Sequence, residues 1–277
     1  MGKVATFPVP GIMGIDTGTL QGHRTHMTRI LAILNYKGGT GKTTTVINLA
    51  AGLALRGERV LAVDLDPQGS IGVSLGVRHP RTISHAMLGH APAEACIVPA
   101  RENFDVIISD TELFQVEGEL WRFNNDSVAR RVLHHTLKPI TDYDYILLDC
   151  SHAISLLTQN ALLCARELLV PIAMDYLAMV GTRQVLQTLK TVGRIPGHQL
   201  RLTLVVPTMY HVQYRKDQEV MALLHRYFDG KVAEPIRSNV RVAEAASHQK
   251  TIFEYAPDSA GAVDYARLVE RIANDVG

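Results

Sequence analysis

Cysteine is scarce in this sequence, and the few cysteines form no recognisable pattern. The 277 residues include three cysteines, Cys96, Cys150 and Cys164, and their spacing fits no zinc-binding motif. An odd and sparse set also argues against a scaffold held together by disulfides. The protein is therefore expected to work in a reducing cytoplasm.

Long apolar runs and obvious linkers are also missing. No run approaches the roughly 18–20 residues that a membrane-spanning helix needs, and no segment rich in Pro, Gly or Ser divides the chain. Met1–His26 lacks the continuous apolar stretch of a signal peptide, so we expect a flexible tail there, and Met27 could be the native start. The 47% hydrophobic content suffices for one large α/β domain. We predict a tail over residues 1–26 and a single domain over residues 27–277.

A strong net charge is absent as well. The formal net charge is +1, so the molecule as a whole is not a polycation. Residues 183–250, however, hold eleven Lys and Arg against five Asp and Glu. Any binding to nucleic acid would have to come from such a local patch. An ordinary solvated basic face explains the same excess equally well.

What the sequence does contain is an alternation of strand-like and helix-like segments. Arg29–Asn35 and Arg59–Asp64 are short apolar runs typical of buried strands, and Lys42–Arg56 between them carries apolar residues at helical spacing. The alternation predicts an α/β fold with a doubly wound, mostly parallel sheet flanked by helices, in which ligands bind at the carboxyl ends of the strands. The other expected strands are 104–109, 145–149, 167–173 and 201–206, and the other expected helices are 127–137, 155–165, 182–192, 218–228 and 261–273.

The loop after the first strand has the composition of a phosphate-binding loop. Its glycines allow backbone N–H groups to surround an anion, and the helix that begins near Lys42 adds the partial positive charge of its N-terminus. Lys42 would supply a charge to the β- and γ-phosphates, and Thr43 a hydroxyl for Mg²⁺. The pattern predicts a P-loop NTPase that binds a nucleoside triphosphate with Mg²⁺. The loop reads Lys37-Gly38-Gly39-Thr40-Gly41-Lys42-Thr43-Thr44.

Acidic residues follow two further strands. Asp64 and Asp66 lie in a D-L-D-P-Q-G segment directly after the second strand. Asp66 could orient the attacking water, and Asp64 could act through Mg²⁺ or its water shell. Taken alone, a simple Asp-Pro-Gln-Gly turn explains this segment too. Asp149 ends the apolar run YILLD and is predicted to act on Mg²⁺ through water.

Together these motifs resemble the ParA/MinD family of ATPases, and in particular its ParA/Soj branch. Tyr36 replaces the first glycine of the ordinary P-loop and Lys37 is an additional lysine, which is similar to the deviant Walker A motif of the family. The D-x-D-P-Q-G segment matches the second signature. The resemblance covers about 250 residues from Met27 onward. It departs from the family pattern where Ser151-His152 replace two prolines and where Arg237-Ser238 replace Pro-Arg. We interpret His152 as a loop substitution rather than a catalytic residue.

The resemblance implies an ATP-hydrolysing enzyme that forms a homodimer around ATP. Lys37 would reach the nucleotide of the partner subunit, and Lys37, Lys42 and Asp66 would be the catalytic residues. It further implies binding to DNA without sequence preference, a ParB-like partner and segregation of plasmid or chromosomal DNA in the cytoplasm, on the nucleoid. No membrane partner is expected, because the final segment Tyr265–Gly277 lacks the basic, bulky apolar stripe of an interfacial helix. The candidate contacts to DNA phosphates in the basic C-terminal half are Arg215, Lys216, Arg237 and Arg241.

Two other functions remain open at this point. An orphan ParA-like ATPase could use the same cycle to distribute a protein cargo, such as carboxysomes or chemoreceptor clusters, through a cargo adaptor; the altered segments at Ser151-His152 and Arg237-Ser238 would fit a new partner. A metabolic P-loop enzyme, such as dethiobiotin synthase or a nitrogenase-type iron protein, is disfavoured. The iron protein needs paired cluster cysteines at its dimer interface, and Cys150 and Cys164 do not supply that pattern.

Overall fold

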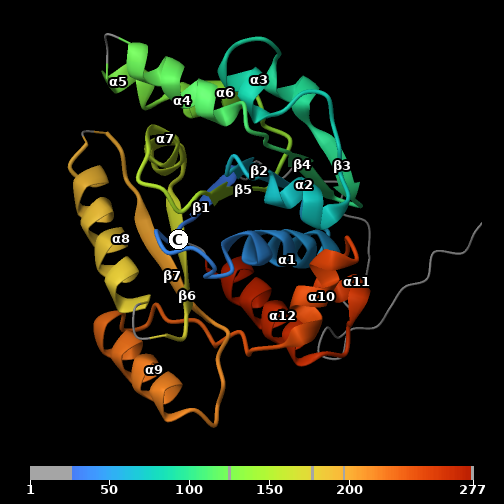
Figure 1. Cartoon of the computed structure of the whole chain (residues 1–277), viewed down its shortest axis with the longest axis vertical. Helices are drawn as coiled ribbons and strands as arrows, with labels where there is room; N and C mark the ends of the chain where they lie inside the picture. The colour runs from blue at the N-terminus through green and yellow to red at the C-terminus, as the bar shows by residue number, and fades with distance from the viewer. Residues whose placement is uncertain (1–26, 124–125, 176–177, 196, 276–277) are drawn as a thin grey trace, which may run out of the picture.

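The computed structural model describes residues 27–123, 126–175, 178–195 and 197–275, so the predicted tail over residues 1–26 lies outside the described residues. Within these ranges one seven-stranded sheet has the order β3-β4-β2-β5-β1-β6-β7 (Figure 1). Every neighbouring pair is parallel except β3 and β4. The strands are β1 (Arg29–Ile33), β2 (Val60–Leu65), β3 (Val98–Arg101), β4 (Phe104–Ile107), β5 (Tyr145–Cys150), β6 (Glu167–Ala173) and β7 (Arg201–Thr208).

The central strands are apolar throughout because both faces of the sheet are covered. In β1, Leu31 and Ile33 belong to one hydrophobic cluster while Ala32 belongs to the other. Helices on both sides bury these faces, as Figure 1 shows. One face carries α1 (Lys42–Leu55), α2 (Ser70–Leu75), α11 (Ile252–Tyr255) and α12 (Ala260–Ala273), with α10 (Val240–Ser247) packed beside them. The other carries α3 (Ile83–Met87), α4 (Leu113–Arg122), α6 (Val132–Leu137), α7 (Leu156–Cys164), α8 (Ala178–Val192) and α9 (Arg215–Tyr227).

Helix α1 follows the phosphate loop and is apolar on nearly all sides, because it lies between the sheet and α12. Gly52 makes this close approach possible. A Cβ at Gly52 would lie 2.4 Å from Val269 Cγ2 and 3.2 Å from the ring of Phe253. The packing of α12 therefore fixes the helix whose N-terminus carries the phosphate loop.

Most expected elements agree with the structure to within a few residues, and the doubly wound fold is confirmed. One expectation is wrong in detail: the helix over 127–137 is divided into α5 (Asp126–Ala129) and α6, because the backbone at Arg131 (φ −117°, ψ 7°) is not helical. The sequence-based assignment also missed α4 and the antiparallel strand β3. Within the described ranges, no helix is both long and apolar enough to cross a membrane.

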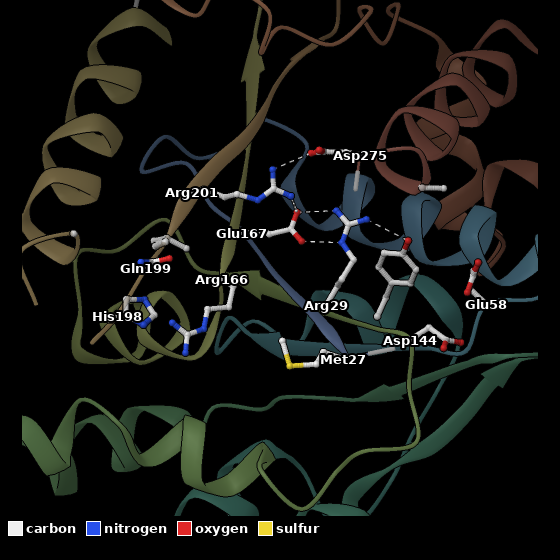
Figure 2. Close-up of a pocket in the computed structure, with 14 residues that line it drawn as sticks. Met27, Arg29, Glu58, Asp144, Arg166, Glu167, His198, Gln199, Arg201 and Asp275 are labelled. Carbon is white, nitrogen blue, oxygen red and sulfur yellow. Dashed lines mark hydrogen bonds and ion pairs between the residues drawn. The ribbon is translucent and has the colours of Figure 1, made fainter. Parts of the chain in front are cut away.

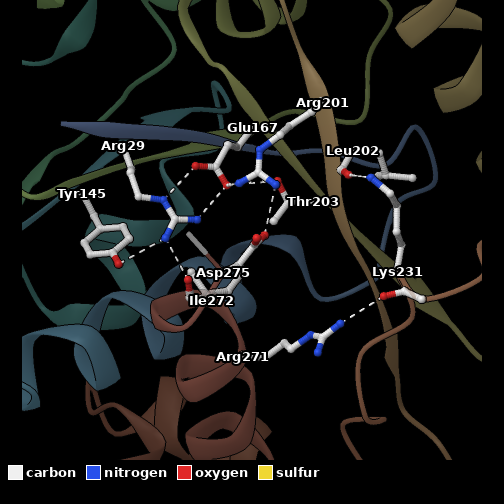
Figure 3. Close-up of polar contacts among 11 residues, drawn as sticks. Arg29, Tyr145, Glu167, Arg201, Leu202, Thr203, Lys231, Arg271, Ile272 and Asp275 are labelled. Atoms are coloured by element: carbon white, nitrogen blue, oxygen red, sulfur yellow. Dashed lines mark hydrogen bonds and ion pairs between the residues drawn. The ribbon is translucent and has the colours of Figure 1, made fainter. Parts of the chain in front are cut away.

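A polar network joins the amino-terminal ends of three strands to the end of the chain (Figure 3). Arg29 on β1 donates two hydrogen bonds of 2.8 Å to the carboxylate of Glu167 on β6 and a third to the Ile272 carbonyl in α12. Arg201 on β7 donates to Glu167 (2.9 Å) and to Asp275 (3.1 Å). Glu167 is buried and receives both guanidinium groups, so the network clamps α12 onto the sheet at the edge opposite the phosphate loop.

Candidate nucleotide-binding site

The loop between β1 and α1 has the backbone shape that its glycines allow. Gly39 (φ +71°) and Gly41 (φ +82°) adopt left-handed conformations, which side chains with a Cβ rarely do. Gly41 is the N-cap of α1, and its carbonyl accepts the first helical hydrogen bond, from Thr45 N–H (2.8 Å). Thr40 is fully buried, and its carbonyl accepts a hydrogen bond from Thr208 Oγ1 at the end of β7 (2.9 Å). Strand β7, two positions from β1 in the sheet, thus anchors the loop.

Lys42, the first residue of α1, is folded back over this loop. Its Nζ lies 3.3 Å from the Lys37 carbonyl, and only 8% of the residue is exposed. Burial lowers the pKa of Lys42, while the nearby carboxylates of Asp149 and Asp66 act in the opposite direction. The side chain is a desolvated cation placed in the loop, as a phosphate-binding lysine requires. Thr43 and Thr44 follow in the first turn of α1 and are partly exposed.

Lys37, the additional lysine of the loop, makes an ion pair with Asp175, which follows β6. Both side chains are partly exposed, at 29% and 41%. The backbone of Lys37 is held separately, because its N–H donates to Asn35 Oδ1 (3.0 Å) and Asn35 Nδ2 donates to the Pro171 carbonyl (2.7 Å). The loop backbone is therefore fixed while the Lys37 side chain stays at the surface.

Two buried carboxylates stand side by side where β2 and β5 end. Asp64 and Asp149 are register partners on adjacent strands, and Asp149 is also opposite Ile33 on β1. Burial raises the pKa of Asp64 to about 7, although its oxygens accept hydrogen bonds from the Asp66 and Ile71 N–H groups (3.0 Å each). Burial, and then the charge of Asp64, raise the pKa of Asp149 as well. The site concentrates negative charge that the protein itself only partly offsets.

Asp66 lies at the surface of this edge. Its carboxylate accepts a hydrogen bond from Gln68 N–H (3.0 Å), and its carbonyl accepts one from Ser109 Oγ, which follows β4. A Cβ at Gly69 would lie 3.0 Å from the Ser109 carbonyl, so the two loops pack closely. The ends of β2 and β4 are thus joined next to the residue expected to orient water.

The residues present fit a magnesium ion. Both carboxylate oxygens of Asp149 are buried with no hydrogen bond of ordinary geometry, and Thr43 is close enough to lower the pKa of this carboxyl. Buried carboxylates rarely lack partners unless a cation is to be bound. Carboxylate and hydroxyl oxygens are also the donors that Mg²⁺ prefers. Thr43 and Asp149, with Asp64 beside them, are the residues that would hold it.

A cavity of about 780 Å³ lies at the other edge of the sheet (Figure 2). It is bounded by the network of Arg29, Glu167 and Arg201 and by the segment around His198. None of the predicted nucleotide-site residues lines it. The chemistry expected from the sequence is therefore concentrated at the carboxyl edge, away from this cavity.

The structure does not bring the four candidate DNA contacts together. Arg215 and Lys216 begin α9, Arg241 lies on α10, and Arg237 precedes α10; α9 and α10 lie in separate parts of the molecule (Figure 1). Arg241 is 57% exposed and pairs with Glu244 (3.1 Å).

Arg237, in contrast, is held by a buried partner. Its guanidinium and its backbone N–H bind Asp264, whose side chain is 2% exposed (2.7 Å for Nη2 to Oδ1). The side chain of Lys216 is also engaged, since it donates to the Met174 carbonyl (2.9 Å). Arg215 is 91% exposed and pairs with Glu219. Arg215 (91%) and Lys216 (62%) are thus the most exposed of the four, followed by Arg241 (57%) and Arg237 (44%).

Comparisons with known proteins decide the family. A family model described as an AAA domain matches residues 28–202. The chain is 41% identical over 245 residues to the chromosome-partitioning ATPase Soj of Thermus thermophilus, covering 88% of this chain and 95% of that protein. It is 35% identical over 249 residues to the chromosome partitioning protein ParA of Caulobacter vibrioides, covering 88% and 93%. The chain belongs to the ParA/Soj family of ATPases.

A solved structure extends this result to the fold. The ParA/Soj-family chain superposes on the septum site-determining protein MinD of Pyrococcus horikoshii, complexed with Mg-ADP, with a TM-score of 0.76 and 25% identity, covering 91% of this chain and 98% of that one. The P-loop NTPase fold expected from the sequence is confirmed.

Several residues that shape the site carried no signal that sequence reasoning used. Asp175 and Thr208 contact the phosphate loop from positions 138 and 168 residues away. Each is a single polar residue at or just after the end of an apolar strand. This position was the only feature of the sequence that could have indicated a contact with the loop. In the segment that departs from the family pattern, Ser151 is buried and His152 is exposed.

Proposed function

We propose that this chain is a partition ATPase that binds ATP with Mg²⁺ and closes into a homodimer. In this state it would bind DNA without sequence preference, on the nucleoid in the cytoplasm, until a ParB-like partner triggers hydrolysis. The observation that carries the proposal is the meeting of the phosphate loop with Asp64, Asp66 and Asp149 at one edge of the sheet. The names of the relatives, a chromosome-partitioning ATPase and a chromosome partitioning protein, support it.

The residues divide the work according to their positions. The N–H groups of residues 38–44 and the buried ammonium of Lys42 would bind the phosphates. When bound, Mg²⁺ would offset the charge that develops on the transferred phosphoryl group. Thr43 and Asp149 would hold it, and Asp64 would act beside them. Asp66 would orient the attacking water from its place at the open side of the site.

Lys37 has a different part, because its side chain points to the surface. We infer that it leaves Asp175 and reaches the nucleotide of the partner subunit, where a second cation would stabilise the transition state. The ion pair with Asp175 is partly exposed, so breaking it costs little free energy, because surface ion pairs contribute little to stability. Lys37 is then needed in the dimer and dispensable for binding nucleotide in the monomer.

Three substitutions test this division. Lys42→Ala should weaken ATP binding by on the order of 10- to 100-fold, because a buried charge–phosphate contact is lost.

Lys37→Ala should bind ATP normally and remain a monomer when ATP is bound. Asp66→Ala should accumulate as an ATP-bound dimer that hydrolyses slowly. Titration calorimetry, sizing with ATP or ADP, and single-turnover hydrolysis measure the three effects.

Lys190→Ala, an exposed lysine on α8, is the matched control and should behave as wild type. Wild-type ATP affinity in Lys42→Ala would show that the phosphate loop is wrongly placed. A normal ATP-dependent dimer in Lys37→Ala would remove the proposed exchange between subunits.

A further inference from the structure

Helix α4 lies in the helical layer on one side of the sheet (Figure 1), and large aromatic side chains on and directly after it are exposed to solvent. Phe114 and Trp121 are 59% and 69% exposed, and Phe123 directly after the helix is 49% exposed. Phe114, Glu117 and Trp121 are spaced i, i+3 and i+7, so they form one stripe along the helix. We call these three residues with Phe123 the α4 face.

The α4 face is not needed to fold the helix. Leu113, Val116 and Leu120 form the opposite, buried stripe of α4 and belong to the hydrophobic core. Trp121 is the only tryptophan of the chain. Exposed tryptophan and phenylalanine side chains in one patch mark interaction surfaces, because such residues provide much of the binding energy at protein interfaces.

The charge around the α4 face restricts what can bind there. Residues 110–121 contain four acidic residues and no Lys or Arg, in a chain whose net charge is +1. Arg122, which follows, is paired with Glu119 (2.5 Å). Nucleic acid and an anionic membrane would both be repelled. Two copies of this chain would place like charges against one another, which disfavours self-association through this face.

We propose that the α4 face is the docking surface for a protein segment that combines Lys or Arg with apolar side chains. The apolar side chains would cover Phe114 and Trp121, and the basic ones would meet Glu117 and its acidic neighbours. This occupant satisfies both the aromatic and the acidic character of the surface. This docking proposal rests on the proposed function, since it assigns the site where a partner of the ATPase binds.

Glu117 of the α4 face is hydrogen-bonded to the start of α7, and Ser109, which precedes α4, is hydrogen-bonded to the loop that carries Asp66. The Leu156 N–H, at the start of α7, donates to Glu117 Oε1 (3.0 Å), and the segment from Asp149 to Leu156 is short. At the other end, α4 follows Ser109, whose hydroxyl donates to the Asp66 carbonyl. A segment that displaces Glu117 or shifts α4 would thus move the surroundings of Asp149 and Asp66. The surface is placed to influence hydrolysis.

Trp121 itself provides the measurement. Three short peptides with leucines at helical spacing, whose polar positions are all Lys and Arg, all Gln, or all Glu, are titrated into the full chain with ATP. The Lys/Arg peptide should shift the tryptophan emission to the blue and should speed single-turnover hydrolysis. The Gln and Glu peptides should do neither. Phe114→Ala should weaken the response by about tenfold or more.

Tyr227→Ala is the matched control, because Tyr227 is an aromatic residue of α9 with 64% exposure. It should bind the Lys/Arg peptide as wild type does. An unchanged emission, an equal response to all three peptides, or self-association that Phe114→Ala abolishes would overturn the docking proposal. ATP binding is measured in the same samples. If it is intact while the peptide response is missing, the docking proposal alone fails, whereas absent ATP binding would count against the proposed function.

Discussion

Asp64 and Asp149 make the nucleotide site less stable than a packed core would be. Both side chains are fully buried, and their strands place them directly opposite one another. The buried ammonium of Lys42 offsets part of this charge, and it lowers the pKa of Asp149, but burial and the charge of Asp64 outweigh it. Neutralising one carboxylate should therefore stabilise the fold and damage the function.

We predict that Asp149→Asn raises the melting temperature of the nucleotide-free protein at about pH 8. The folded-state pKa of Asp149 is raised, so the stability of the wild type falls as pH rises from the ordinary pKa of an aspartate towards the folded value. The variant lacks this loss. Its advantage should be about 1 kcal/mol, or roughly 2–4 °C, at pH 8 and should shrink at about pH 5.

Adding ATP and Mg²⁺ should reverse the order, because only the wild type keeps the carboxylate that would hold the ion. Thermal melts at the two pH values, with and without Mg-ATP, measure both effects. Asp105→Asn is a control: Asp105 lies on β4, outside the site, and bonds to Tyr143 (2.6 Å). If the variant melts below the wild type at pH 8, the negative charge of Asp149 is already offset by its surroundings in the nucleotide-free protein.

At the scale of elements, two helical glycines give opposite predictions. Gly52→Ala in α1 should destabilise the fold by about 1–3 kcal/mol, because its methyl group would meet Val269 of α12. Gly118→Ala in α4 should stabilise it by about 0.5–1 kcal/mol, since a Cβ there meets nothing within 4 Å and alanine favours a helix. Denaturant unfolding of the two variants measures the difference. Equal changes in the free energy of unfolding would mean that α12 does not pack tightly against Gly52 of α1.

The sequence predicted best the elements whose pattern is continuous. The buried strands around β1 are unbroken apolar runs, and α1 follows a glycine loop that marks its start, so their positions could be read directly. Helix α4 was missed although Leu113, Val116 and Leu120 are spaced as one helical face, because the exposed aromatic residues Phe114 and Trp121 add apolar positions outside that face. Strand β3 was missed because it is short, contains Pro99 and runs antiparallel at the edge.

The site was predictable as far as its motifs are local. The composition and spacing of Gly38–Thr44, and the acids Asp64 and Asp149 at the ends of two strands, indicate a site for phosphate and a metal ion. The contacts of Lys37 with Asp175 and of Thr40 with Thr208 join distant parts of the chain, and only the order of the strands brings them together. The ion pair between Arg237 and Asp264 was equally hidden, so the sequence did not show that this candidate DNA contact is also held by a buried carboxylate.

At the scale of the whole molecule, DNA binding is expected to need two subunits. Among the four candidate contacts, the exposed basic residues lie on separate helices, with Arg215 and Lys216 at the start of α9 and Arg241 on α10. A dimer formed with ATP would double the number of contacts on one duplex. If each subunit neutralises two or three phosphates, the log–log dependence of affinity on salt should have a slope of roughly −4 to −5.

We predict that binding to random-sequence duplex DNA is strong with ATP and weak with ADP or without nucleotide. Arg241→Ala should lower the affinity and make the slope less steep by about 2, since two copies of the residue are lost per dimer. It should leave ATP binding unchanged, because Arg241 lies outside the phosphate loop. Arg237→Ala is the informative comparison: it should lower the melting temperature by leaving Asp264 buried without its partner. Salt titrations by fluorescence anisotropy in the three nucleotide states provide the measurement. Equal affinity in all three states, or none at low salt, would remove DNA from the cycle and point to a protein scaffold instead.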